Sequence, residues 1–267
     1  MSSATNPAAD AAFAALVELH RGLPRQGPGS DALARTVVEA IRPFLPTAPR
    51  VADLGCGSGH TARLLASWLG TVVDAVDAAP EFVAECRAAP LPAAGEVAAK
   101  VGDMLDTTLL APPYDLIWSE GAAYAVGVER ALACWRDLLA PRGVVVYSDC
   151  CWLTDAPPAA TATFWRTAYP EMTTERAASA RAERLGFAVL HTHTLPEQTW
   201  WDSYYGPLQR RIEGLAPTVP AGSALAAAID EAQREMDVFR ASGGSYGYVV
   251  FVLRRSQPRT RADSGPR

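Results

Sequence analysis

The chain has 267 residues, of which 49% are hydrophobic, and its formal net charge is −5. That much apolar sequence can bury a full core, so global disorder is excluded, and the length fits one large domain or a core domain with an insertion. The acidic balance argues against a nucleic-acid surface and an anionic-membrane surface, since each would need a basic face.

The cysteines and the apolar runs indicate a cytoplasmic protein. The five cysteines show neither zinc-ligand spacing nor a secretory framework, so we interpret them as small buried hydrophobes in a reducing compartment. We see no signal peptide at the start, and no apolar run reaches about 18 residues, so secretion and membrane spanning are not expected. We expect no metal.

The N-terminal part, residues 1–45, is predicted to hold two helices and a lid. Residues 1–10 are small and polar and are expected to fray, and 11–20 form a short amphipathic pattern. The stretch 22–30 is too rich in glycine and proline for a helix or a strand. Ser30 or Asp31 can cap the helix that follows, which we expect to end near Phe44.

From Arg50 onward, short apolar runs alternate with helical stretches. This alternation predicts an α/β fold, a Rossmann-like doubly wound sheet of seven strands that is mostly parallel, with an antiparallel last strand. Expected strands cover 50–54, 72–77, 97–102, 113–118, 143–149, 187–194 and 246–254, and expected helices 60–69, 80–88 and 128–140. We assign 46–255 to this domain, with a helical insertion at about 196–244, and expect a disordered tail at 256–267.

The most informative stretch is residues 51–60, where a strand ends in a loop of alternating glycines and a helix follows at once. Glycine is needed where the backbone approaches a ligand closely or takes a positive φ. Gly57-x-Gly59-x-x-Ala62 formally matches the dinucleotide fingerprint, although such a match alone is weak. A nicotinamide-dependent oxidoreductase is therefore one reading of this loop.

Acidic residues after the first three strands argue against a dinucleotide. Asp53 places a carboxylate where it could receive an ammonium group, and it would repel a pyrophosphate. Asp77 ends the second strand, where it is suitably placed to bind ribose hydroxyls. A dinucleotide and any other ribose-containing cofactor would both require such an acid. Asp103 and Met104 follow the third strand and suit the edge and the face of an adenine.

With these motifs in order, the chain resembles the class I S-adenosylmethionine (SAM)-dependent methyltransferases over about 45–150. The resemblance implies that the glycine loop carries the methionine part of SAM, that Asp77 holds the ribose and that Asp103 holds the adenine amine. Residues 115–121 resemble the fourth strand and the turn lining the donor site, and 139–143 resemble the turn into strand five. The implied cofactor-binding residues are Arg25, Gln26, Gly29, Asp53, Gly55, Gly57, Gly59, Asp77, Ala78, Asp103, Met104, Ser119 and Glu120.

A tighter resemblance is carried by 25–30, 118–124 and 152–155. It points to bacterial small-molecule methyltransferases related to those of quinone biosynthesis. It implies a small-molecule acceptor and leaves the acceptor's identity open. A homodimer is also left open.

Methyl transfer from a sulfonium is an in-line displacement, so the protein mainly supplies alignment and a dry site. Glu120, Tyr124 and His20 are the catalytic candidates. Alternatively, Glu120 is an acid at a helix N-terminus that the helix dipole stabilises, and Tyr124 is a packing residue. His191 and His193 share a strand face but have no evident third metal ligand.

The aromatic residues of the insertion are candidates for the acceptor pocket, with plain packing as the alternative. The expected acceptor-binding set is Tyr124, Trp152, Trp200, Trp201, Tyr204 and Tyr205. We therefore predict a SAM-dependent methyltransferase. A SAM-binding sensor or partner protein without transferase activity is the rival hypothesis.

Overall fold

The computed structural model describes residues 6–90 and 93–256. Its helices are α1 (Pro7–His20), α2 (Asp31–Ile41), α3 (His60–Leu69), α4 (Pro80–Ala88), α5 (Val128–Leu138), α6 (Ala159–Ala168), α7 (Glu175–Arg184), α8 (Glu197–Trp200), α9 (Gly206–Leu215) and α10 (Ala224–Ala241). Its strands are β1 (Val51–Leu54), β2 (Val72–Asp77), β3 (Glu96–Val101), β4 (Tyr114–Ser119), β5 (Leu139–Trp152), β6 (Thr173–Thr174), β7 (Phe187–Thr194) and β8 (Tyr246–Arg255).

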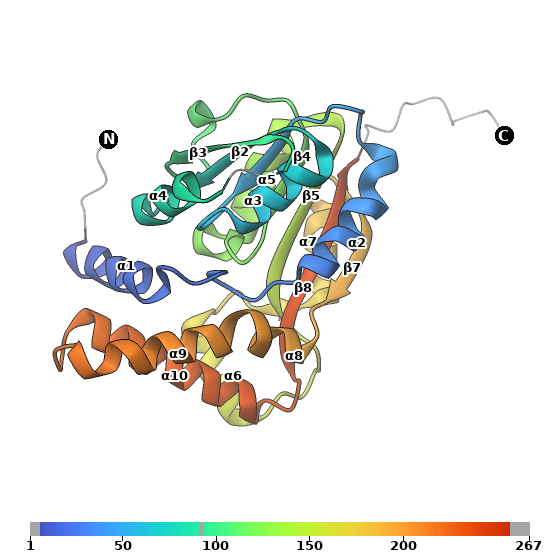
Figure 1. The fold of residues 1–267 in the computed structure, drawn as a ribbon. Helices are drawn as coiled ribbons and strands as arrows, with labels where there is room; N and C mark the ends of the chain where they lie inside the picture. Colours follow the sequence, from blue (N-terminus) through green and yellow to red (C-terminus); the bar gives the residue numbers. More distant parts are fainter. Residues whose placement is uncertain (1–5, 91–92, 257–267) are drawn as a thin grey trace.

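One sheet organises the molecule, with strand order β3-β2-β1-β4-β5-β8-β7 (Figure 1). Strands β1 to β5 run parallel, and β8 pairs antiparallel with both β5 and β7. The predicted doubly wound sheet with an antiparallel last strand is thereby confirmed. The prediction of seven strands misses β6, a two-residue strand beside β5, because so short a strand shows no periodicity.

Strand β5 is longer than the sequence suggests. Residues 139–143 were expected to form a turn, and the helix before it was expected to reach 140. Instead α5 ends at Leu138, and Leu139 pairs with Tyr114 before a register shift. This correction has a physical reason: a bulge accommodates Pro141 and Gly143, which locally favour a turn, at the start of the paired strand.

Helices cover both faces of the sheet. Buried side chains of α2, α3 and α4 pack on one face, and those of α5 and α7 pack on the other. Helix α1 begins at Pro7 rather than at residue 11, because Asn6 caps it by accepting from the Ala8 amide at 3.2 Å. The expected fraying of 1–10 is therefore wrong for residues 7–10. Residues 1–5 and the expected tail from 257 lie outside the described residues.

Besides the helices on the two faces of the sheet, a third layer of helices, formed by α1, α6, α8, α9 and α10, lies below the sheet in Figure 1. The inserted helices share a hydrophobic cluster with the start of β8 through Trp200, Phe239 and Tyr246. A π-helical turn, η4 (Trp201–Tyr205), joins α8 to α9. Of the helices described, none is long and apolar enough to cross a membrane.

Candidate functional site

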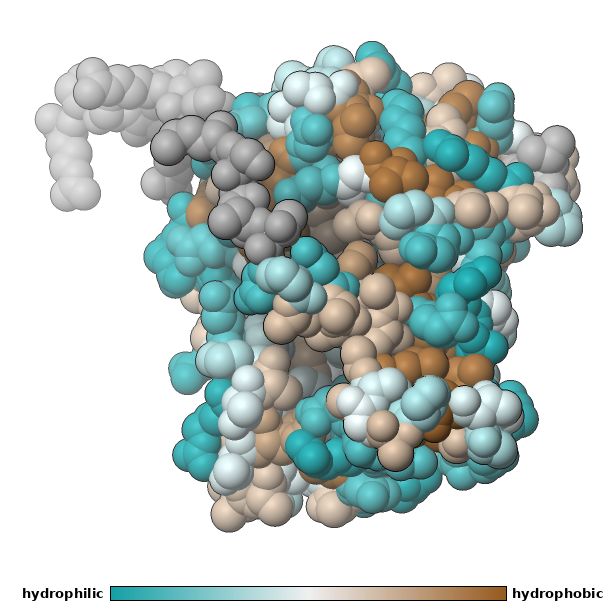
Figure 2. Space-filling model, turned by 90° about the vertical axis from the view of Figure 1, so that its left-hand side faces the viewer, coloured by the Kyte–Doolittle hydropathy of each residue, from teal (hydrophilic) through white to brown (hydrophobic). Residues whose placement is uncertain are grey.

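A cavity of about 440 Å³ lies between the sheet and the third layer. Residues that follow β1, β2 and β4 line its upper part, and α1 and α10 contribute to the opposite side. Ligands of open α/β sheets bind beyond the carboxyl ends of the strands, which is where this cavity lies. The face shown in Figure 2 is hollowed at mid-height, between the sheet part and the lower helices.

The glycine loop after β1 has the backbone shape that its sequence predicts. Gly55, Gly57 and Gly59 all have positive φ, and Gly57 at 53° also donates its amide to Asp77 at 2.8 Å. The other Asp77 oxygen accepts from the Ala79 amide at 2.9 Å. Asp77 thus ties the glycine loop to the end of β2, and both elements line the cavity.

Asp53 has a buried oxygen without a hydrogen-bond partner in the described part of the chain. Its side chain is buried, with a relative exposure of 2%, and its Oδ2 has no hydrogen-bond partner among the described residues. Burial, together with the charges of Glu120 and Asp77, raises the pKa of Asp53 well above its ordinary value. A buried carboxyl with one unsatisfied oxygen at a cavity wall favours a cationic ligand group over an anionic one.

The segment of residues 25–30, which we call the lid segment, is docked over this loop by polar contacts. Gln26 accepts through Oε1 from the amide and the hydroxyl of Ser58, at 3.0 and 3.1 Å. Arg25 donates to Glu120 at 2.9 Å and to Asp31 at 2.6 Å. Both side chains line the cavity, so the lid segment completes its wall.

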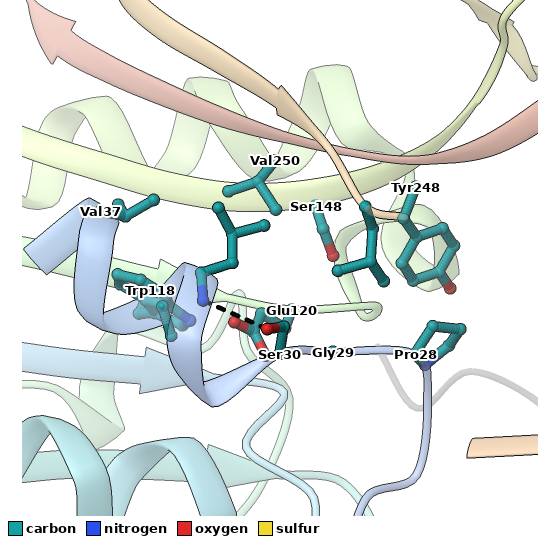
Figure 3. A pocket seen from close by; sticks show the side chains of 12 residues that line it. Pro28, Gly29, Ser30, Val37, Trp118, Glu120, Ser148, Tyr248 and Val250 are labelled. Carbon is teal, nitrogen blue, oxygen red and sulfur yellow. Dashed lines mark hydrogen bonds between the residues drawn. The ribbon is translucent and has the colours of Figure 1, made fainter. Parts of the chain in front are cut away.

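Glu120 lies where the lid segment meets the turn after β4. Besides the bond from Arg25, its Oε2 accepts from the Thr61 hydroxyl at 3.2 Å. Figure 3 shows Glu120 beside Gly29 at the edge of a smaller pocket of about 10 Å³. A Cβ added to Gly29 would lie 2.5 Å from Arg25 Nη1, so a side chain at this position would displace the guanidinium from its present place beside Glu120.

His20 and Tyr204 meet on the far side of the cavity from the glycine loop. His20 Nδ1 lies 2.8 Å from the Leu16 carbonyl, which can only accept, and Nε2 lies 3.0 Å from the Tyr204 hydroxyl. Burial lowers the pKa of His20, which favours the neutral ring. The neutral ring donates through Nδ1 and therefore accepts from Tyr204 through Nε2.

Glu235 of α10 lies on the same side and was not singled out from the sequence. Its Oε1 accepts from the Tyr205 hydroxyl at 2.7 Å, and the residue lines the cavity. Phe13 and Leu16 of α1 and Tyr124 also line it, and each is exposed by 46–47%. This half of the cavity is therefore largely apolar and aromatic, with one carboxyl group.

The structure brings most of the predicted site residues to the cavity. Those that line it are His20, Arg25, Gln26, Asp53, Gly55, Gly57, Asp77, Ala78, Met104, Glu120, Tyr124 and Tyr204.

Several predicted cofactor residues do not line the cavity. The Asp103 carboxylate is exposed and accepts from the Leu105 amide at 2.9 Å. The Ser119 hydroxyl is buried and donates to the Leu54 carbonyl at 2.7 Å. Gly59 caps α3, and Gly29 borders the smaller pocket instead.

The insertion aromatics differ most from the expectation. Trp200 and Tyr205 are buried in the third hydrophobic cluster, and Trp201 packs beneath the Arg240 guanidinium at 4.5 Å. Trp152 packs edge-on against Tyr246. Of the predicted acceptor residues, Tyr124 and Tyr204 are the ones that reach the cavity. The π-helical turn sets which rings of the insertion face inward, and a linear sequence does not reveal it.

Some lining residues could not be singled out from the sequence. The amphipathic pattern of α1 indicates a buried stripe but not that Phe13, Leu16 and Val17 face a cavity. Glu235 is one acid among several on α10. Thr61 and His60, at the start of α3, also line the cavity, and the sequence could have singled them out because they directly follow the glycine loop. Among the residues that the structure describes, no cluster of His, Cys, Asp or Glu could hold a metal.

Comparison with known proteins identifies the domain. Residues 51–143 match the family described as methyltransferase domain. A trans-aconitate 2-methyltransferase from Streptomyces avermitilis is 38% identical over 133 residues, which are 46% of this chain and 45% of that protein. The match thus spans less than half of that relative's length.

Solved structures share the fold across nearly the whole chain. A SAM-dependent methyltransferase from Thiobacillus denitrificans, in complex with S-adenosylhomocysteine (SAH), superposes with a TM-score of 0.72 at 18% identity, covering 91% of this chain and 98% of that one. The [4+2]-cyclase SpnF superposes with a TM-score of 0.68 at 18% identity, covering 93% and 94%. The second comparison shows that this fold is not restricted to proteins named as methyltransferases.

Proposed function

We propose that the chain, whose residues 51–143 match a methyltransferase domain family, binds SAM and transfers the methyl group to a small-molecule acceptor. The observation that carries this proposal is the buried Asp53 carboxyl at the glycine loop, whose Oδ2 has no hydrogen-bond partner among the described residues. SAM, when bound, supplies an electrophilic methyl group on its sulfonium. The remaining chemistry comes from residues of this chain.

The upper half of the cavity fits SAM by the chemistry of its donors and acceptors. Asp53 offers a carboxyl to the ammonium of the methionine part, and the glycine loop allows that part to approach the backbone. Asp77 keeps free lone pairs on both oxygens for ribose hydroxyls, since each oxygen accepts one amide bond. Met104 offers an apolar contact to the adenine.

The acids of this half also argue against a nicotinamide cofactor. Arg25 is the one lysine or arginine among the described residues that line the cavity, and it is already bonded to Glu120 and Asp31. A pyrophosphate would therefore face the Asp53 and Asp77 carboxyls without a free cation. SAM carries an ammonium and a sulfonium, and these positive charges are stabilised by nearby carboxyl groups.

The lower half of the cavity would hold the acceptor. Phe13, Leu16 and Tyr124 provide apolar contact, and closure by the lid segment excludes water from the displacement. The Tyr204 hydroxyl can accept a proton from the acceptor while its own proton passes to His20 Nε2. The bond between them holds this pair ready for an acceptor that must lose a proton.

A SAM-binding sensor without transferase activity is the second candidate. The His20 to Tyr204 pair favours the enzyme, because a sensor has no need of a proton acceptor at the cavity. The five free cysteines, four of them buried, fit the cytoplasm that we propose as its location. We propose no partner beyond the small-molecule acceptor.

Two measurements test the proposal. Calorimetry on the full chain should show binding of SAH, and incubation with SAM and a library of small molecules should release SAH with at least one of them. Replacing Tyr204 with Phe should leave SAH affinity unchanged and slow that release. Absence of SAH binding in the wild type would refute the proposal. Binding without turnover across the library would favour the sensor.

A further inference from the structure

The acceptor half of the cavity carries a carboxylate that no cation of the chain neutralises. Glu235 makes no salt bridge among the described residues, and its one hydrogen bond is the Tyr205 hydroxyl on Oε1. Acids elsewhere on α10 are differently placed: Glu231 and Asp237 form exposed ion pairs with Arg234 and Arg240. Burial raises the pKa of Glu235, and an ammonium group at this cavity wall would favour its ionised form.

Tyrosine rings lie on the same side of the cavity as this carboxyl. Tyr205 and Tyr204 are in contact, with ring centroids 5.1 Å apart, and Tyr124 borders the same cavity. Burial and then the charge of Glu235 raise the pKa of Tyr204 well above its ordinary value, so its ring stays neutral. A carboxylate beside electron-rich aromatic faces is the arrangement that recognises alkylammonium groups.

The rest of the cavity provides no site for an acidic acceptor. Arg25 lies at the cofactor end and is already paired with Glu120 and Asp31, and His20 is neutral and bonded to Tyr204. A molecule with several carboxylates, such as trans-aconitate, would face Glu235 with no free cation among the described lining residues. The trans-aconitate methyltransferase from Streptomyces avermitilis matches less than half of this chain, so its substrate is not carried over to this cavity.

From this arrangement we propose that the acceptor is an amphipathic amine whose ammonium group lies against Glu235 and whose apolar part contacts Phe13, Leu16 and Tyr124. The proposal rests on the proposed function, because it assigns the substrate class of the same site. It makes Glu235 a specificity-determining residue that binds the acceptor. It leaves the transfer of the methyl group to the groups described above.

Three probes of similar size and different charge test this assignment. Tyramine, 4-ethylphenol and 4-hydroxyphenylacetate share a phenol ring and carry, respectively, an ammonium, no charge and a carboxylate. Their affinities are measured by calorimetry on the full chain saturated with SAH, so that the cofactor end is filled. We expect tyramine to bind about tenfold more tightly than 4-ethylphenol, the effect of one charge-assisted hydrogen bond. The carboxylate probe should bind most weakly.

Two variants separate the charge of Glu235 from a general effect. Glu235→Gln should weaken tyramine about tenfold and leave 4-ethylphenol within about twofold. Asp230→Asn, the same change at an exposed position of the same helix, should leave all three affinities unchanged. Retained SAH affinity shows that each variant is folded.

The outcomes are distinguishable. If wild-type protein binds SAH but binds 4-ethylphenol or the carboxylate probe as well as tyramine, the amine assignment is overturned and the proposed function stands. The same conclusion follows if Glu235→Gln keeps the preference for tyramine. If the wild type does not bind SAH, the proposed function fails and the assignment fails with it.

Discussion

Asp53→Asn should stabilise the ligand-free protein and weaken its ligand binding. Asp53 Oδ2 is buried without a partner, and an unsatisfied charged group costs more than a neutral one, whose cost of about 1–3 kcal/mol an asparagine amide would still carry. A neutral amide of the same shape removes the buried charge and the repulsion from Glu120 and Asp77. We therefore expect a gain of about 1–3 kcal/mol, and in a chain of this size ~1 kcal/mol raises Tm by ~2–4 °C.

The pH dependence of this gain follows from the raised pKa of Asp53. In the folded chain the carboxyl binds its proton more tightly than in the unfolded chain, whose pKa is near 3.8. As the pH rises above that value, the unfolded state loses this proton first, and the ligand-free wild type loses stability relative to Asp53→Asn. The stability gap between the two proteins should widen with pH and then become constant.

Thermal unfolding of both ligand-free proteins between pH 5 and 8 measures the gap, and SAH calorimetry measures the loss of binding. Loss of a charge-assisted bond to the ammonium should weaken SAH by about 10–100-fold. Asp230→Asn, an exposed acid on α10, is the control and should change neither quantity. A variant that is less stable than the wild type at pH 8, or that binds SAH normally, would refute the reasoning.

Three further predictions concern the loop, the lid segment and the insertion. Asp77→Asn should weaken SAH about tenfold and lower Tm, because one amide oxygen cannot replace the two carboxylate oxygens that accept from the Gly57 and Ala79 amides; calorimetry measures the affinity and thermal unfolding the Tm. Gln26→Ala should speed hydrogen exchange of the Ser58 amide in the ligand-free protein, and an unchanged rate would contradict docking of the lid segment. Trp200→Ala should lower the free energy of unfolding in urea by about 3–5 kcal/mol. An unchanged free energy of unfolding would contradict the core position of this ring and support a place in the acceptor pocket.

The parts of the fold that follow local chemistry could be predicted from the sequence. The glycine loop and the acids after β1 and β2 are encoded within a few residues of one another, and the structure places Asp53 and Asp77 at one cavity. The start of β5 could not be predicted, because pairing of Leu139 with Tyr114 overrides the local turn preference. Glu235 could not be singled out, because its role depends on contacts with segments far away in the sequence.

The position of β8 has a consequence for how the chain folds during synthesis. This strand lies between β5 and β7 in the sheet, although it follows both in the sequence. Until residues 246–255 leave the ribosome, β7 has no partner in the sheet and one edge of β5 is bare. The 103 residues from the end of β5 at Trp152 to the end of β8 at Arg255 take about 5–20 s to synthesise. During that interval the nascent chain exposes the edges of β5 and β7 that β8 later pairs, and these edges are sites for chaperone binding or for aggregation.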